Sequence, residues 1–150
     1  MGLRWLWRRF DELTGEQVYR ILALREQVFI VEQECLYRDI DGRDAHAHHL
    51  LGLDASGSLV AYLRLVAPGY RFPEPCIGRV VTDPATRGQG YGHALMKEGI
   101  RRAAEIYPGQ PIRISAQRYL EGFYGAHGFV PSGDPYDEDG IEHREMVRTP

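Results

Sequence analysis

Residues 76–106 read CIGRVVTDPATRGQGYGHALMKEGIRRAAEI, and this stretch decides the fold. Residues 76–82 are rich in β-branched side chains and predict a strand, which Asp83-Pro84 ends. Three alternating glycines follow at positions 88, 90 and 92. Small and apolar residues then recur on one helical face: Gly92, Leu95, Met96, Gly99, Ala103 and Ile106. A strand, a glycine-rich turn and a helix in this order favour pyrophosphate binding, because backbone N–H groups and the positive helix end point at the anion.

The glycine spacing excludes two common phosphate-binding motifs. A P-loop needs Gly-Lys-Ser/Thr at its end, which is absent here. A dinucleotide fingerprint needs Gly-x-Gly-x-x-Gly and an acidic residue about 20 positions later, and the chain has neither. Taken alone, residues 88–92 are also compatible with a plain glycine turn.

The flanking segments predict further helices and strands. Thr14-Gly15-Glu16-Gln17 has the form of a capping box, and apolar residues at helical spacing extend the predicted helix to about Val31. A short strand precedes it, and a polar, acidic loop covers residues 32–45. The turn Asp54-Ala55-Ser56-Gly57 joins two strands, so the following segments predict a hairpin: 49–53 and 59–66.

Composition narrows the class of protein. The 150 residues suit one domain, with 43% hydrophobic residues available for a core. No apolar run is long enough to cross a membrane, and a net charge of −3 argues against nucleic acid as the main partner. Without an export signal we expect a cytoplasmic protein, in which Cys35 and Cys76 stay unpaired. The His46-x-His48-His49 sequence lacks further ligands at metal-binding spacing, so no metal is expected.

Two motifs resemble the GCN5-related N-acetyltransferase (GNAT) superfamily. Arg87-Gly88-Gln89-Gly90-Tyr91-Gly92 resembles its Gln/Arg-x-x-Gly-x-Gly/Ala signature, and residues 123–129, FYGAHGF, resemble its Leu-Tyr-x-x-x-Gly-Phe element. Gln117 stands seven residues before Tyr124, where the family often has Asn. Other stretches resemble the ElaA branch: 31–33, 37–42, 77–80 and 136–143.

The resemblance implies a fold, a co-substrate and a set of residues that bind it. The fold would be a single three-layer α/β domain over residues 1–150, with a mixed, mostly antiparallel sheet flanked by helices. The activity would be transfer of the acetyl group of acetyl-CoA to a primary amine, by direct attack in a ternary complex. The backbone of Val80, Val81 and Thr82 would bind the pantetheine arm, and the N–H of Val81 would polarise the thioester carbonyl. The remaining cofactor-binding residues would be Arg87, Gly88, Gln89, Gly90, Tyr91, Gly92, His93 and Gln117.

The same resemblance proposes Tyr124 as the group that protonates the departing thiolate. Gly128 is expected in the left-handed region after a helix end, with Phe129 packing back on the last turn. The general base stays open. The strand at 76–82 has no carboxylate, so Glu32 and His143 are candidates, Asp41 and His49 are weaker ones, and a water-mediated base is an alternative.

The acceptor would be a small-molecule or protein amine. Two acidic segments, residues 32–44 and 134–142, favour a cationic amine, although plain solvent-exposed loops explain them equally well. The loop at 67–75 could form a homodimer contact or cover the site. A non-catalytic acyl-CoA sensor and a ligand-free interaction domain remain as alternative functions.

Overall fold

The computed structural model describes residues 2–150, and its elements follow the predicted order. The helices are α1 (Gly15–Arg25), α2 (Tyr91–Ile106) and α3 (Glu121–Gly125). The strands are β1 (Arg4–Arg9), β2 (Ala47–Leu53), β3 (Leu59–Val66), β4 (Cys76–Thr82), β5 (Ile112–Gln117), β6 (Val130–Pro131), β7 (Tyr136–Glu138) and β8 (Ile141–Arg148). Short helical turns are η1 (Phe10–Glu12), the π-helical η2 (Glu26–Glu32), η3 (Asp44–His46), η4 (Pro84–Thr86) and η5 (Arg118–Leu120). Within residues 2–150, no helix is long and apolar enough to span a membrane.

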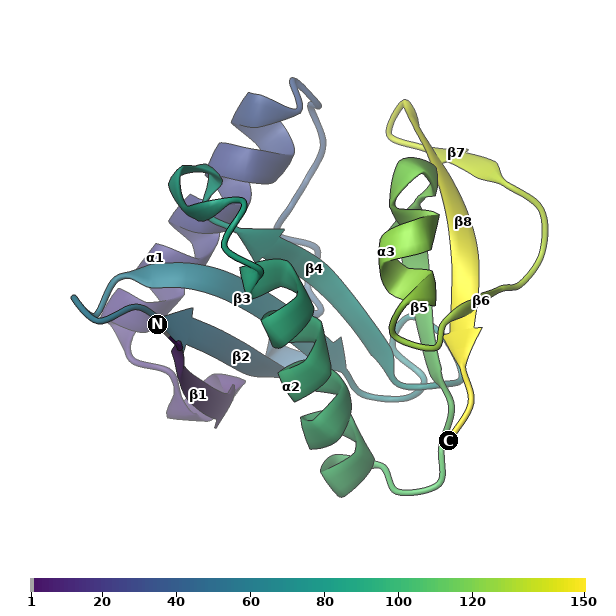
Figure 1. Cartoon of the computed structure of the whole chain (residues 1–150), viewed down its shortest axis with the longest axis horizontal. Coiled ribbons are helices and arrows are strands. Elements are labelled where there is room, and N and C mark those ends of the chain that lie inside the picture. The colour runs from purple at the N-terminus through teal and green to yellow at the C-terminus, as the bar shows by residue number, and fades with distance from the viewer. Residues whose placement is uncertain (1) are drawn as a thin grey trace.

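The strands form one mixed sheet, as predicted. Within residues 2–150 its order is β1-β2-β3-β4-β5-β8-β6, with β7 paired to β8. All neighbours are antiparallel except β4 and β5. Helices α1 and α2 cover opposite faces of the β1–β4 half, and α3 lies beside the β5–β8 half, which gives three layers (Figure 1).

Strands β4 and β5 diverge soon after they meet. Their only paired position within residues 2–150 is Cys76 with Arg113, so the rest of β4 has no strand partner on that side. A bulge contributes to this divergence, because Arg79 and Val80 together stand opposite Leu63 and Arg79 has a φ of +49°. Bulges bend a strand and increase its twist. The two halves of the sheet therefore separate toward the C-terminal end of β4 (Figure 1).

Helix α2 lies close to the sheet because its inner face carries small residues. A Cβ added at Gly99 would come within 2.6 Å of a Leu63 methyl group, so only glycine fits this approach without repacking. Leu95, Met96 and Ala103 are also buried, as predicted. Ile106, predicted on the same face, is 38% exposed because the helix ends there and passes beyond the core.

The first helix begins as the sequence predicts and ends differently. The Thr14 hydroxyl accepts a bond from the Gln17 N–H, and the Gln17 side chain accepts one from the Thr14 N–H. The α-helix ends at Arg25, and the predicted extension to Val31 is a π-helical turn. Arg25, the last residue of α1, is completely buried and holds Asp39 and Asp44 of the acidic loop.

Candidate functional site

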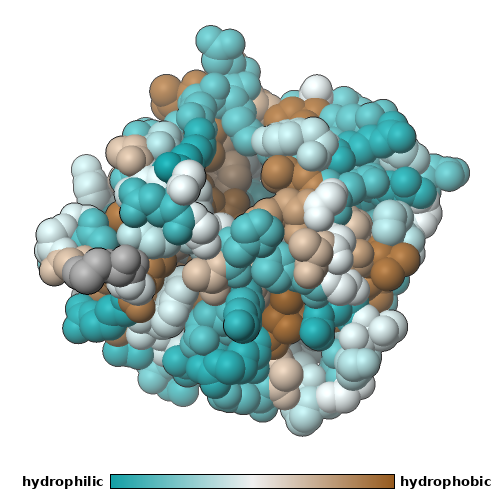
Figure 2. Space-filling model, in the orientation of Figure 1, coloured by the Kyte–Doolittle hydropathy of each residue, from teal (hydrophilic) through white to brown (hydrophobic). Residues whose placement is uncertain are grey.

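The divergence of β4 and β5 opens a cavity of about 770 Å³. In the space-filling view, the molecule is hollowed between its two halves, with apolar residues deep in the hollow and hydrophilic ones around it (Figure 2). Nine of the predicted site residues line this one cavity: Glu32, Val80, Val81, Thr82, Arg87, Gly92, Gln117, Tyr124 and His143. The others adjoin it on the exposed turn between Arg87 and the first turn of α2: Gly88, Gln89, Gly90, Tyr91 and His93.

The glycine turn forms an open cradle at the start of α2. Gly88 and Gly90 have φ values of +85° and +78°, and no atom lies within 4 Å of a Cβ added at either. Gly90 is the N-cap and supplies no side chain, so the first N–H groups of α2 have no side-chain cap. Free N–H groups at a helix N-terminus suit a phosphate. The turn and the unpaired edge of β4 together fit the pyrophosphate and the amide-bearing arm of an acyl-CoA.

Arg87, expected to add a charged contact to the co-substrate, is bound to Glu32. Its two terminal nitrogens lie 2.7 and 2.6 Å from the two carboxylate oxygens. The Arg87 bond lowers the pKa of Glu32, and the Glu32 bond raises the pKa of Arg87. A carboxylate with a lowered pKa is a weaker base, so this pairing makes Glu32 a poor proton acceptor.

Tyr124 lies near the C-terminal end of α3 and lines the cavity. Its ring packs edge-on against Phe123 and Phe129, with centroid distances of 5.1 and 6.2 Å. Gly128 has a φ of +90° and Phe129 is buried, so the helix end predicted from the sequence is present. Within residues 2–150 the Tyr124 hydroxyl makes no hydrogen bond, and burial raises its pKa, so the phenol keeps its proton.

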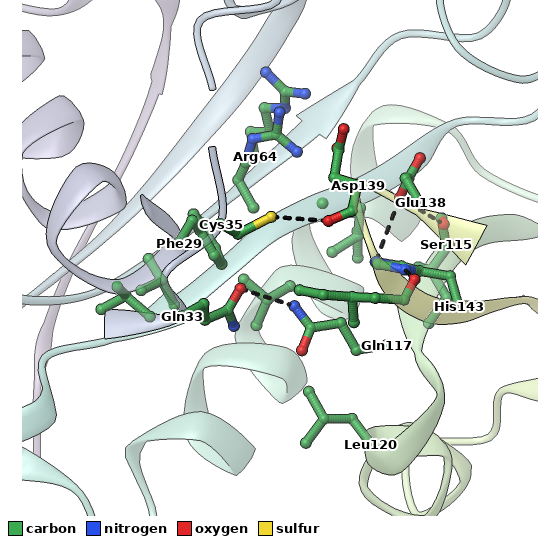
Figure 3. A pocket seen from close by; sticks show the side chains of 18 of the residues that line it. Phe29, Gln33, Cys35, Arg64, Ser115, Gln117, Leu120, Glu138, Asp139 and His143 are labelled. Atoms are coloured by element: carbon green, nitrogen blue, oxygen red, sulfur yellow. Dashed lines mark hydrogen bonds and ion pairs between the residues drawn. The ribbon is translucent and has the colours of Figure 1, made fainter. Parts of the chain in front are cut away.

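His143 lies on β8, in the same half of the molecule as α3, between two oxygen acceptors (Figure 3). Its Nδ1 is 2.8 Å from the Ile141 carbonyl oxygen, and its Nε2 is 3.3 Å from a Glu138 carboxylate oxygen. A carbonyl oxygen only accepts, so Nδ1 carries the hydrogen and Nε2 is the nitrogen that can gain a proton. Ser115 and Arg71 also bond to Glu138 and fix its position.

Two hydrogen bonds connect the walls across the cavity (Figure 3). The Gln117 amide nitrogen donates to the Gln33 side-chain oxygen at 3.3 Å. The Cys35 thiol donates to the Asp139 carbonyl oxygen at 3.0 Å. Gln117 and Asp139 belong to the β5–β8 half, whereas Gln33 and Cys35 follow α1. These bonds therefore hold the segment after α1 against the other half of the sheet.

The acidic loop after α1 is largely neutralised by arginines. Asp41 contacts Arg43, Arg64 and Arg79, and Asp39 contacts Arg25 and Arg79. Asp44 binds Arg25 and Arg64, with distances of 2.8 and 2.9 Å. Burial opposes the charge on Asp41 and Asp44, but the arginine contacts outweigh it and lower the pKa of both carboxyls. The negative charge that was expected to attract a cationic amine is therefore largely neutralised by arginines of the protein itself.

The other histidine candidates have structural contacts. His49 is buried, bonds the Tyr62 hydroxyl and the Asp44 carbonyl oxygen, and has a pKa lowered by burial. His48 stacks on Trp7, and His46 stacks on Tyr70. His49 does not line the cavity, whereas Asp41 does.

Sequence reasoning missed several residues that line the cavity, including Cys35, Arg64, Arg79, Ser115 and Glu138. One available signal was Asp139-Gly140, a pair that favours a tight hairpin turn. Both residues have positive φ, 55° and 81°, and the hairpin of β7 and β8 brings Glu138 beside His143. The arginine contacts carry no local signal, because they depend on how the acidic loop folds over β3 and β4.

The family model for the acetyltransferase (GNAT) domain matches residues 10–150. The chain therefore belongs to the GNAT acetyltransferase family, whose fold and activity are those of acyl-CoA-dependent N-acetyltransferases.

Within this family the chain is similar to ElaA and to UPF0039 proteins. It is 46% identical to a UPF0039 protein of Synechocystis over 98% of this chain and 96% of the relative. It is 38% identical to Protein ElaA of Escherichia coli over 97% and 96% of the two chains. The crystal structure of E. coli ElaA superposes with a TM-score of 0.91 over 97% of this chain and 99% of that one. An acyl-CoA N-acyltransferase from Pseudomonas aeruginosa, 41% identical, superposes with a TM-score of 0.93 over 99% and 100%.

Proposed function

We propose that this chain, acting as one catalytic domain over residues 1–150, transfers the acetyl group of acetyl-CoA to a primary amine. The observation that carries the proposal is the unpaired edge of β4, which runs into the glycine turn at the start of α2 and forms one wall of the cavity. Acetyl-CoA supplies the activated acetyl thioester. The edge of β4 at Val80, Val81 and Thr82 binds its arm. The Val81 N–H, expected to polarise the thioester carbonyl, points instead to Tyr62 of β3, because the Asp83 N–H bonds the Val60 carbonyl oxygen and bonded pairs alternate along the ladder from there. The turn from Arg87 to His93 holds the pyrophosphate, and Gln117 borders the arm from β5.

The two proton positions lie on α3 and β8, and both line the cavity. Tyr124 holds a proton at its phenolic oxygen for the sulfur that leaves. His143 accepts a proton from the amine at Nε2, which lies beside the Glu138 carboxylate. His143 is favoured over Glu32 because Glu32 is bound on both oxygens by Arg87.

Direct attack in a ternary complex is favoured over an acyl-enzyme. The cavity is continuous from the glycine turn to the wall with His143, so both substrates fit at once. Cys76 is buried, which raises the pKa of its thiol to about 11 and makes it a poor nucleophile. The Cys35 thiol donates its hydrogen to Asp139.

Cofactor binding is tested by thermal unfolding with acetyl-CoA, with NADH and ATP as controls. A ligand at about 100 times its Kd adds about 2.7 kcal/mol, which raises Tm by roughly 5–10 °C for a chain of this size. Catalysis is tested by release of free thiol with a panel of primary amines. If acetyl-CoA binds but no amine causes release of free thiol, the result would instead support a non-catalytic acyl-CoA sensor.

The base is tested by comparing His143→Gln with Glu32→Gln. We expect His143→Gln to lower kcat about a hundredfold while acetyl-CoA binding stays unchanged. Glu138→Gln should lower kcat less than His143→Gln, because it removes the carboxylate beside Nε2 but keeps the imidazole. Unchanged rates in both His143→Gln and Glu32→Gln would assign the proton to a water chain.

A further inference from the structure

Arginines gather at the end of the cavity beside the first half of β4. Arg64 stands in register with Gly78, and Arg79 follows at the bulge, so both lie before the part of β4 that leads to the glycine turn. Arg43 and Arg71 line the same cavity from neighbouring loops. Phe72 and Tyr37 pack against two of these guanidinium groups, over Arg71 and Arg79 respectively. The side chains are therefore held in place without any ligand.

Three of these arginines use only part of their hydrogen-bonding capacity. Arg71 donates a hydrogen bond from Nη2 to Glu138. Arg43 donates from Nε to the Tyr70 carbonyl oxygen and from Nη1 to Asp41. Arg79 donates from Nη2 to Asp39 and Asp41, and its Nε lies against the Asp39 carboxylate. A guanidinium carries five N–H donors. Within residues 2–150, Nη2 of Arg43, Nη1 of Arg71 and Nη1 of Arg79 make no hydrogen bond. Their side chains are 33, 24 and 22% exposed, so solvent and ligands reach them.

The charges around this end of the cavity leave an excess of positive charge. The ionic cluster on the acidic loop combines four arginines (25, 43, 64 and 79) with three aspartates (39, 41 and 44). Asp41 already contacts three guanidinium groups, which leaves it little capacity to bind an ammonium group. Arg71 and Glu138 balance each other, and so do the charges of Arg38 and Asp139, which also line the cavity. A half-enclosed site with excess positive charge attracts anions.

We propose that the acceptor is an amine that also carries an oxyanion, which Arg43, Arg71 and Arg79 bind. The planar guanidinium fork matches a carboxylate or a phosphate, and prior anchoring of each fork reduces the entropy lost on binding. The amine then lies toward His143, which shares Glu138 with Arg71. This inference rests on the proposed acetyl transfer. The fully buried Arg25 and Arg64 hold the loop, so the more exposed arginines are available to a ligand.

The test compares acceptors of equal chain length with saturating acetyl-CoA. The probes are 4-aminobutyrate, 3-aminopropyl phosphate, butylamine and 4-aminobutanamide. We expect kcat/KM for at least one of the two anionic amines to exceed that of both neutral-tailed amines by tenfold or more. The anion with the higher kcat/KM shows whether the oxyanion of the acceptor is a carboxylate or a phosphate. The same four types of probe with chains of two to six carbons are measured in parallel, because the distance between the amine and the oxyanion must match the site. Equal kcat/KM values for all four probes at every length would overturn the inference.

Binding of the same probes to the CoA-saturated protein is measured by calorimetry. Absence of turnover for every amine counts against the proposed function alone. Absence of any preference for the anionic probes in binding counts against the oxyanion site. The two failures are therefore distinguishable.

The variants Arg43→Gln and Arg71→Gln test the residues, with Arg101→Gln as the control. Arg101 lies on the exposed face of α2 and bonds Glu98 and Glu105, away from the cavity. We expect the ratio of kcat/KM between the preferred anion and butylamine to fall at least fivefold in one or both cavity variants and to stay unchanged in the control. Melting temperatures report whether each variant is folded. An unchanged ratio in both folded cavity variants would refute the assignment.

Discussion

Glu32 and Arg87 meet edge to edge, carboxylate against guanidinium, at the mouth of the cavity. The contacts are 2.6 and 2.7 Å, and they join the end of the π-helical turn after α1 to the glycine signature before α2. The residue expected to attract the co-substrate is therefore already neutralised by a residue considered as the base. Binding of a polyanionic co-substrate must compete with this ion pair.

Glu32→Gln should tighten acetyl-CoA binding a few-fold and change kcat less than threefold. The substitution frees Arg87 and removes a negative charge near the predicted pyrophosphate site, and the effect stays small because an exposed ion pair is weak. Calorimetry gives Kd, and thiol release gives kcat. Glu16→Gln is the matched control, because Glu16 pairs with Arg20 on the outer side of α1. A hundredfold loss of kcat in Glu32→Gln would identify Glu32 as the base.

Tyr124→Phe should lower kcat about a hundredfold with little change in the Kd of acetyl-CoA. The ring, which packs on Phe123 and Phe129, is kept, and only the proton donor is removed. Because burial raises the pKa of Tyr124, the wild-type rate should show no loss from this group up to its ordinary value of 10. Tyr19→Phe, on the exposed side of α1, is the control. Equal rates in wild type and Tyr124→Phe would exclude the phenol as the acid.

The elements that position the co-substrate could be predicted because their signals are local. The capping box at Thr14, the strand before Asp83 and the left-handed Gly128 each depend on a few neighbouring residues, and the structure contains all three. The helical face predicted from Gly99 and Ala103 is likewise the face of α2 that lies against the sheet.

The acceptor end could not be predicted in the same way. Arg25 has the spacing of a helical face residue, and only the folding of the acidic loop over β3 turns it into a buried ion-pair partner. Acidic residues counted along the sequence suggested a negative surface, yet Asp41 meets three arginines from three different segments. The partner of His143 depends on a hairpin register that brings Glu138 back across the turn.

Asp41→Asn should destabilise the fold by about 3 kcal/mol at neutral pH, because it removes one of the two counter-charges of the buried Arg64 and also frees Arg43 and part of Arg79. The pKa of Asp41 in the folded state lies below its ordinary value of 3.8. Its contribution is therefore complete above about pH 5 and is lost as the pH falls below about 4. The difference between wild type and variant should narrow over that acidic range. Urea unfolding at pH 7 and at pH 3.5 measures both values.

Asp11→Asn serves as the control for this comparison. Asp11 is 73% exposed, and its one ion pair within residues 2–150 is with Arg9, so its loss should cost less than about 0.5 kcal/mol at either pH. A constant difference between wild type and Asp41→Asn from pH 7 to pH 3.5 would contradict the titration argument.

Gly92→Ala should separate cofactor binding from stability. Gly92 has an ordinary helical φ, and an added Cβ would lie 3.5 Å from the Phe123 ring, an ordinary van der Waals contact. Alanine favours a helix over glycine by up to about 1 kcal/mol, so Tm should stay the same or rise. The methyl group nevertheless enters the cavity at the first turn of α2, where backbone N–H groups must approach the pyrophosphate. We therefore expect the Kd of acetyl-CoA to rise tenfold or more. Gly15→Ala, at the first turn of α1 with open space around it, should keep both values. If Gly92→Ala bound acetyl-CoA as tightly as the wild type, the pyrophosphate would have to lie elsewhere than at the start of α2.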